Sequence, residues 1–190
     1  HGGTHLDAPI HFVEGKWTTD QVPLDHLIGP AVVVDVSAAV AGAGADYRVA
    51  EHDLTGWEQA NGPIPAGAIV LFRTGWGTRW PNRARYLGTT KTGPAAVAEL
   101  HFPGIAPEAA RVLVARGVHA VGIDTPSIDY GQSQTFETHL ILLAENISGL
   151  ENVANLDRLP ATGAFVVALP MKIAGGSGGP LRMVAWVDEK

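Results

Sequence analysis

The chain has 190 residues, of which 46% are hydrophobic and 17% charged, so it can fold as one domain with a sizeable core and does not belong to the disordered class. It contains no cysteine, which excludes a disulfide framework, a thiolate metal site and a cysteine nucleophile. The net charge of −6 argues against a nucleic-acid partner, and no apolar run approaches the roughly 20 residues that cross a bilayer. We therefore expect a soluble, cytoplasmic protein with neither nucleic acid nor a membrane as its partner.

Short runs rich in β-branched residues predict buried strands, and they alternate with segments predicted to be helical. The predicted strands are Ala31–Val36, Ala68–Arg73, His119–Ile123, Ala164–Pro170 and Leu181–Val187. The predicted helices are Val49–Ala60, Pro94–Leu100 and Pro107–Arg116. Glycine and proline in the joints at Ile64–Gly67 and Gly175–Pro180 favour a mixed sheet over a strict βαβ series. We predict one α/β domain over residues 1–190, with a mixed sheet and flanking helices.

The first twelve residues, HGGTHLDAPIHF, hold three of the eight histidines and one aspartate. Alternate side chains of an extended chain share a face, so His5 and Asp7, about 7 Å apart along a strand, can converge on one ion. Four extended residues would place His1 about 13 Å from His5, so the chain must turn back at Gly2-Gly3. Pro9 ends the extended run, which lets His11 lie beside a metal ion without being one of its ligands. The alternative is a loop with incidental polar histidines, and the flanking Gly, Thr and Pro favour the metal site.

This segment resembles the H-x-G-T-H-x-D-x-P-x-H signature of the metal-dependent cyclase-like hydrolases, the family that contains bacterial kynurenine formamidase and isatin hydrolase. It matches at every fixed position. GIDTPS at 122–127 and the tail from Glu151 to Pro180 also resemble the family, and the tail is similar to that of the isatin-hydrolase-like branch. The resemblance implies a domain of the swivelling β/β/α type and a homo-oligomer, a dimer or larger. It also implies that an N-terminal part of the natural domain precedes His1.

The resemblance assigns roles to the histidines and carboxylates. It implies that His11 is the general acid/base. The implied metal ligands, which would hold one or two ions, are His1, His5, Asp7, His139 and Glu151. The residues themselves support this assignment, because all of these donors are nitrogen or oxygen and suit Zn²⁺ or Mn²⁺ as the cofactor.

Three further side chains are candidates for binding substrate because they follow predicted strands, where α/β folds place site residues. Asp124 and Ser127 come after one strand, and Trp76 follows another. Each also has a structural interpretation: Asp124 and Ser127 can cap a turn, and Trp76 can pack in the core or an interface. The same alternatives hold for Tyr130 and Phe136.

The remaining histidines and motifs carry no prediction of chemistry. Four histidines lack partners in any recognisable spacing, and we expect surface or turn positions for His26, His52, His101 and His119. The glycine run at 175–179 lacks the Lys-Ser/Thr of a phosphate-binding loop and is predicted to be a turn between strands. No serine lies in a G-x-S-x-G elbow, so a serine hydrolase has no nucleophile here.

We predict a metal-dependent hydrolase that cleaves a C–N bond, other than a peptide bond, in a small aromatic amide or lactam. With an ordinary pKa near 6.5, His11 can take a proton from the attacking water and return it to the leaving nitrogen. The tail favours a cyclic, isatin-like amide. The alternatives are an arylformamidase acting on N-formylkynurenine, a non-catalytic metal-binding protein, and a lyase or ring-closing enzyme.

Overall fold

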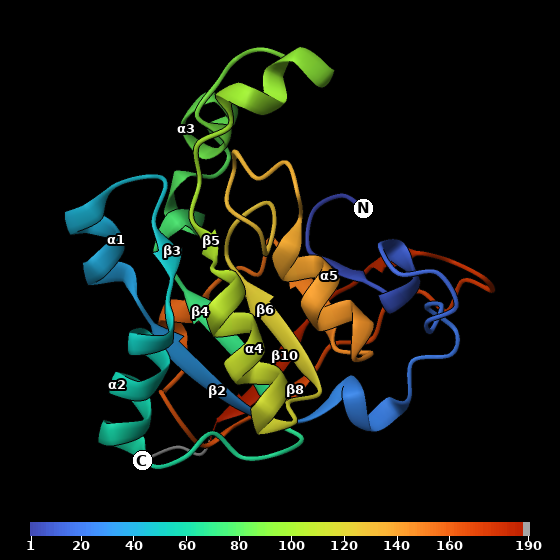
Figure 1. Cartoon of the computed structure of the whole chain (residues 1–190). Coiled ribbons are helices and arrows are strands. Elements are labelled where there is room, and N and C mark those ends of the chain that lie inside the picture. The colour runs from blue at the N-terminus through green and yellow to red at the C-terminus, as the bar shows by residue number, and fades with distance from the viewer. Residues whose placement is uncertain (188–190) are drawn as a thin grey trace.

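The computed structural model describes residues 1–187 and shows one α/β unit built on a mixed eight-stranded sheet (Figure 1). The strands, in their order across the sheet, are β10 (Val184–Val187), β8 (Ala164–Val167), β2 (Ile28–Asp35), β4 (Ile69–Arg73), β6 (Ala120–Ile123), β7 (Ser148–Glu151), β1 (His5–Asp7) and β9 (Gly178–Pro180). The four central strands from β2 to β7 are parallel, and the pairs outside them are antiparallel. A separate short sheet pairs β3 (Arg48–Val49) with β5 (Gly104–Ile105).

Within residues 1–187, five α-helices connect or flank these strands. They are α1 (Ser37–Ala43), α2 (Glu51–Asn61), α3 (Arg83–Leu87), α4 (Pro107–Arg116) and α5 (Glu137–Ala144). Short 3₁₀-helices lie at Pro9–His11, Leu24–His26, Trp76–Arg79, Pro94–Glu99 and Leu156–Arg158. Over residues 1–187, no helix has both the length and the apolar character to cross a membrane.

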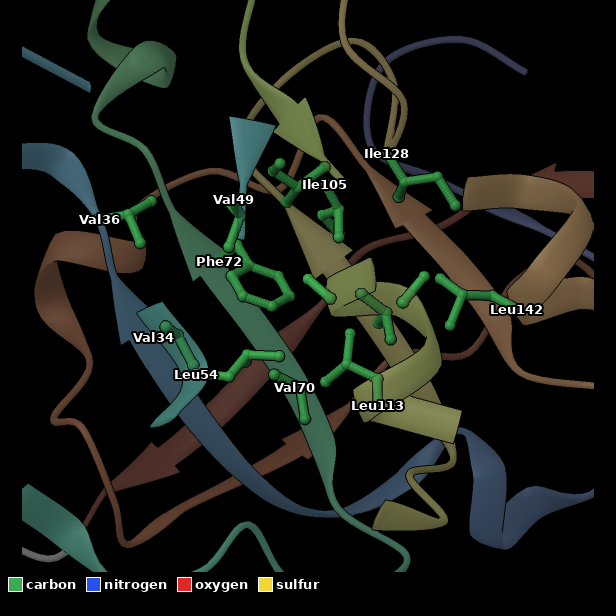
Figure 2. Packing of buried hydrophobic residues seen from close by; sticks show 14 of the residues in the cluster. Val34, Val36, Val49, Leu54, Val70, Phe72, Ile105, Leu113, Ile128 and Leu142 are labelled. Atoms are coloured by element: carbon green, nitrogen blue, oxygen red, sulfur yellow. The ribbon is translucent and has the colours of Figure 1, made fainter. Parts of the chain in front are cut away.

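Strand β4 is buried on both faces because its side chains alternate between two hydrophobic clusters. Val70 and Phe72 face the layer that contains side chains of α2 and α4 (Figure 2). Ile69 and Leu71 face the opposite layer, which is covered by the N-terminal segment and the loop after β7 instead of an α-helix. Burial on both sides explains why this strand is a continuous apolar run rather than an alternating one.

The structure contains all five predicted strands, with ends that differ by up to three residues, and it confirms the mixed sheet with flanking helices. The predicted helix Pro107–Arg116 is confirmed as α4, and Val49–Ala60 is present as α2. The segment Pro94–Leu100 forms a 3₁₀-helix rather than an α-helix. It is short and follows Gly93, and short connectors of this kind commonly take 3₁₀ geometry.

Candidate active site

Strand β1 carries the first half of the site because it lies between β7 and β9. The antiparallel pairing with β7 places His5 opposite Glu151 and Asp7 opposite Gly149. His5 and Asp7 point to one face of the strand, while Leu6 between them enters the core. As a result, Nε2 of His5 lies 3.1 Å from Oδ1 of Asp7 and 3.4 Å from Oε2 of Glu151.

Helix α5, which packs beside the N-terminal segment (Figure 1), brings His139 to the same point. Its Nε2 lies 3.4 Å from Oδ2 of Asp7 and 3.2 Å from Oε1 of Glu151. Its Nδ1 lies 2.6 Å from Oδ2 of Asp129, and Nδ1 of His5 lies 2.9 Å from a backbone carbonyl. With both Nδ1 atoms donating to oxygen, each ring presents Nε2 as its ligand atom.

The donor set fits a divalent cation. The ligand atoms of His5, Asp7 and Glu151 lie within 4.8 Å of one another, as do those of His1, Asp7 and His11, so each set is close enough to share an ion with bonds of about 2.0–2.2 Å. Burial alone would lower the pKa of His139, but hydrogen bonds to Asp129 and the other carboxylates outweigh burial and raise it to about 11. Burial would raise the pKa of Asp7, yet hydrogen bonds to the histidines hold it at about 2. Both shifts show that the carboxylates attract positive charge, and a divalent metal ion bound to neutral imidazoles can supply that charge.

His1 and His11 lie on the open side of this cluster. Nδ1 of His1 lies 2.5 Å from Oδ1 of Asp7, and its ring stacks on that of His11 at 4.2 Å. Nε2 of His11 is farther from the cluster, 3.9 Å from Oδ2 of Asp7, and burial lowers the pKa of His11. His1 also packs against Gly178 of β9, where an added Cβ would lie 2.6 Å from its Cε1. The glycine run is therefore not only a turn, because its last residues form a strand that makes room for His1.

These residues line a cleft of about 450 Å³ with aromatic side chains on its wall. The ring of Phe12 lies 4.5 Å from that of His139 and 5.1 Å from that of Phe136. Phe136 has φ of +50°, a strained value for a bulky residue that is typical of functional sites. The predicted substrate residue Ser127 also lines this cleft.

The structure brings together six residues proposed from the sequence, and their individual roles stay predictions. They are His1, His5, Asp7, His11, His139 and Glu151. Asp124 lies beside the cleft, buried, where it accepts hydrogen bonds from Thr74 and lines a neighbouring compartment; burial raises its pKa. Trp76 is not on the wall of the cleft. It is 2% exposed, packs in the core, and donates its indole N–H to the carbonyl of Tyr86.

The sequence analysis missed Asp129, Phe12 and Asn152. Asp129 acts on His139 across a loop and a helix start, a contact that no local spacing encodes. Phe12 follows the last histidine of the motif directly, and this adjacency was the available signal. Asn152 follows a predicted ligand in the same way and lines the cleft.

The histidines expected at surface or turn positions include one pair with a partner that spacing did not reveal. His26 and His119 stack face to face, with ring centroids 3.9 Å apart. Nδ1 of His26 lies 3.2 Å from the carbonyl of His119, and Nδ1 of His119 lies 2.8 Å from the carbonyl of Asp25. His101 contacts Asp46 at the surface.

The sequence and the fold both match known proteins. The model of the Cyclase family matches residues 1–130. The chain belongs to the Cyclase family. This Cyclase member is 37% identical to isatin hydrolase of Roseibium aggregatum, over 100% of the chain and 72% of the relative. It is 33% identical to kynurenine formamidase of Salinibacter ruber, over 97% of the chain and 74% of the relative.

Solved structures agree with this assignment. An isatin hydrolase bound to the product analogue thioisatinate superposes with a TM-score of 0.89 and 35% identity, covering 98% of the chain and 72% of that protein. Two others, at 27% and 28% identity and TM-scores of 0.74 and 0.67, are described as a potential metal-dependent hydrolase with cyclase activity and as a predicted metal-dependent hydrolase from Bacillus stearothermophilus. This Cyclase member is thus an isatin-hydrolase-like, metal-dependent hydrolase.

Proposed function

We propose that the protein opens the C–N bond of a small aromatic cyclic amide of the isatin type. The observation that carries the proposal is the convergence of His5, Asp7, His139 and Glu151 on one point, with the ring of His11 beside them in the same cleft. The identity to isatin hydrolase over the whole chain supports the cyclic amide.

In this proposal Mn²⁺ or Zn²⁺ is held by the buried ligands, and a second ion would share Asp7 with His1. A bound divalent ion supplies polarisation of the scissile carbonyl and a lower pKa for the attacking water. His11 takes the proton from this water as its oxygen bonds to the amide carbon. As the C–N bond breaks, His11 returns the proton to the nitrogen, so the products are a carboxylate and an amine. The rings of Phe12 and Phe136 face the substrate and exclude bulk water.

We also propose that the domain is of the swivelling β/β/α type and that the protein forms a homo-oligomer, a dimer or larger. For the oligomer, the supporting feature is an exposed aromatic pair near one edge of the sheet, where Phe165 of β8 lies opposite Trp186 of β10. Such a surface is typical of a contact between protein chains.

A turnover assay tests the proposal. The protein is chelated and then assayed on isatin, N-formylkynurenine and an aryl lactone, with and without Mn²⁺ or Zn²⁺. We expect activity only with metal and the highest kcat/KM on isatin. Faster turnover of N-formylkynurenine would establish the formamidase alternative, which the identity to kynurenine formamidase supports. Full activity with no metal detectable by elemental analysis would refute the proposal.

A further inference from the structure

Asn152 is the residue after Glu151, and it lines two adjacent cavities. It lines the metal-binding cleft and also an apolar compartment of about 250 Å³ next to it, walled by Trp80 and Tyr86. The backbone here is held firmly: its N–H donates to the carbonyl of Thr125 at 2.9 Å, and its carbonyl accepts from the Thr4 hydroxyl at 2.7 Å. The side chain therefore has a fixed origin on the cleft wall.

Tyr86 fixes the rotation of the Asn152 carboxamide. The Tyr86 hydroxyl lies 3.0 Å from Oδ1 of Asn152 and 3.1 Å from the carbonyl of Asp124. Burial raises the pKa of Tyr86, so the hydroxyl keeps its proton and donates. With Oδ1 turned toward Tyr86, the amide nitrogen is the atom of Asn152 that remains for a ligand.

Asn152 also has an unusual backbone for a non-glycine residue, with φ of +55°. Asparagine tolerates this region better than most residues, and glycine tolerates it without cost. A Gly at this position would keep the backbone and lose only what the side chain contacts, which is the Tyr86 hydroxyl and whatever occupies the cleft.

We propose that Asn152 determines specificity by donating a hydrogen bond to a second oxygen of the substrate, on the carbon next to the scissile carbonyl. This inference rests on the proposed function, and it narrows the substrate to amides with two adjacent carbonyl groups. In this arrangement the scissile carbonyl lies at the metal ligands, which include Glu151. Asn152 is the next residue on the cleft wall and reaches the oxygen on the neighbouring carbon of the substrate. A ligand without that oxygen leaves the amide N–H groups unpaired, which penalises binding. Tyr86 is a positioning residue, because it acts through Asn152.

A pair of matched acids tests the inference without requiring turnover. Phenylglyoxylate carries a keto oxygen next to its carboxylate, and phenylacetate has a methylene there. Calorimetric titration of the Mn²⁺-loaded protein gives both Kd values. We expect the wild-type protein to bind phenylglyoxylate about 10- to 100-fold more tightly than phenylacetate, which corresponds to the usual penalty for leaving a buried donor without an acceptor.

Variants assign this ratio to the side chain. Asn152→Gly, which keeps the backbone, and Asn152→Asp, which keeps the shape but cannot donate, should both bring the ratio to within about threefold of one while metal content stays unchanged. Tyr86→Phe should reduce the ratio only in part and leave phenylacetate binding as it was. Asn155→Gly is the matched control, because Asn155 has φ of +61° in the same loop but lines a different groove, and it should keep the wild-type ratio.

The outcomes separate this inference from the proposed function. A wild-type ratio near one, or a full ratio in Asn152→Gly, overturns the role of Asn152 even if isatin is hydrolysed. A ratio that depends on Asn152 in a protein that does not hydrolyse isatin supports the binding role and refutes the proposed function.

Discussion

Asp129 offers a sharp test of how the protein holds its metal ion, because it touches a ligand but would not touch the metal. Its Oδ2 lies 2.6 Å from Nδ1 of His139, and both side chains are almost completely buried. Asp129→Asn keeps the volume and removes the charge that orients and polarises the imidazole. Loss of such a supporting contact weakens metal binding about 10- to 100-fold, which corresponds to about 1.4–2.8 kcal/mol.

The same substitution has a second, separable effect on stability. The Asp129 carboxylate also accepts the backbone N–H groups of Thr138 and His139 at the start of α5. A carboxylate at a helix N-terminus contributes about 0.5–2 kcal/mol, and an asparagine retains part of this. Urea unfolding of the metal-free protein measures this loss, and competition with a chromophoric chelator measures metal affinity.

Asp124→Asn is the matched control for both measurements. Asp124 is also a buried carboxylate, but it accepts hydrogen bonds from Thr74 and the N–H of Gly77 and from no proposed ligand. We expect it to lower stability and to leave metal affinity unchanged. If Asp129→Asn and Asp124→Asn shifted metal affinity by the same factor, or if neither did, the supporting role of Asp129 would be refuted.

Three further predictions concern the acid/base, the strand packing and the stacked histidines. His11→Ala should keep the metal and lower kcat by roughly 10²- to 10⁴-fold, whereas Asp7→Ala should lose the metal. If the His11→Ala protein contained no metal, His11 would be a metal ligand and not the acid/base. Gly178→Ala should weaken metal binding because its added Cβ would clash with the backbone carbonyl of Leu6 in β1 and lie 2.6 Å from Cε1 of His1. Gly149→Ala, on the other side of Asp7 and with no contact under 3.4 Å, should leave metal binding unchanged. Equal metal affinities in the two variants would contradict this prediction. Burial lowers the pKa of His26, so the contribution of His26 to stability is complete above pH 6.5 and is lost as the pH falls below that value. The free energy of unfolding, measured by urea titration, should therefore fall less between pH 7.5 and pH 5.5 in His26→Gln than in the wild-type protein. Equal losses in the two proteins would disprove the effect.

Local signals in the sequence identified some elements of the fold and missed others for physical reasons. Helix α4 was predictable because Pro107 starts it and Gly117, with φ of +65°, ends it. Helix α5 carries no such signal: it is apolar on most sides, and Phe136 before it provides no side-chain cap. Its start is anchored by Asp129 from an earlier loop, so the contact that begins this helix is tertiary.

Part of the candidate site was likewise predictable from the sequence, and part of it was not. The spacing of His5 and Asp7 predicted their common face, and the family motif supplied His139 and Glu151. For Trp76 the sequence left substrate binding and core packing as alternatives, and in the structure its indole lies in the core, where the N–H donates to a backbone carbonyl. A side chain of that size at a strand end is stabilised by burial in either place, so the sequence alone does not distinguish them.

The position of the site depends on the register of one three-residue strand. With His5 opposite Glu151, the two polar side chains of β1 face the cleft and Leu6 fills the hydrophobic layer behind it. A slip by one residue would turn His5 and Asp7 into that layer and expose Leu6. Burying an ionisable group without a partner costs several kcal/mol, and exposing a leucine costs about 1.5–3 kcal/mol more, so both effects oppose the slip. Packing and chemistry therefore select the same register, and this agreement allows a short strand to place Asp7 beside a histidine 132 residues away in the chain.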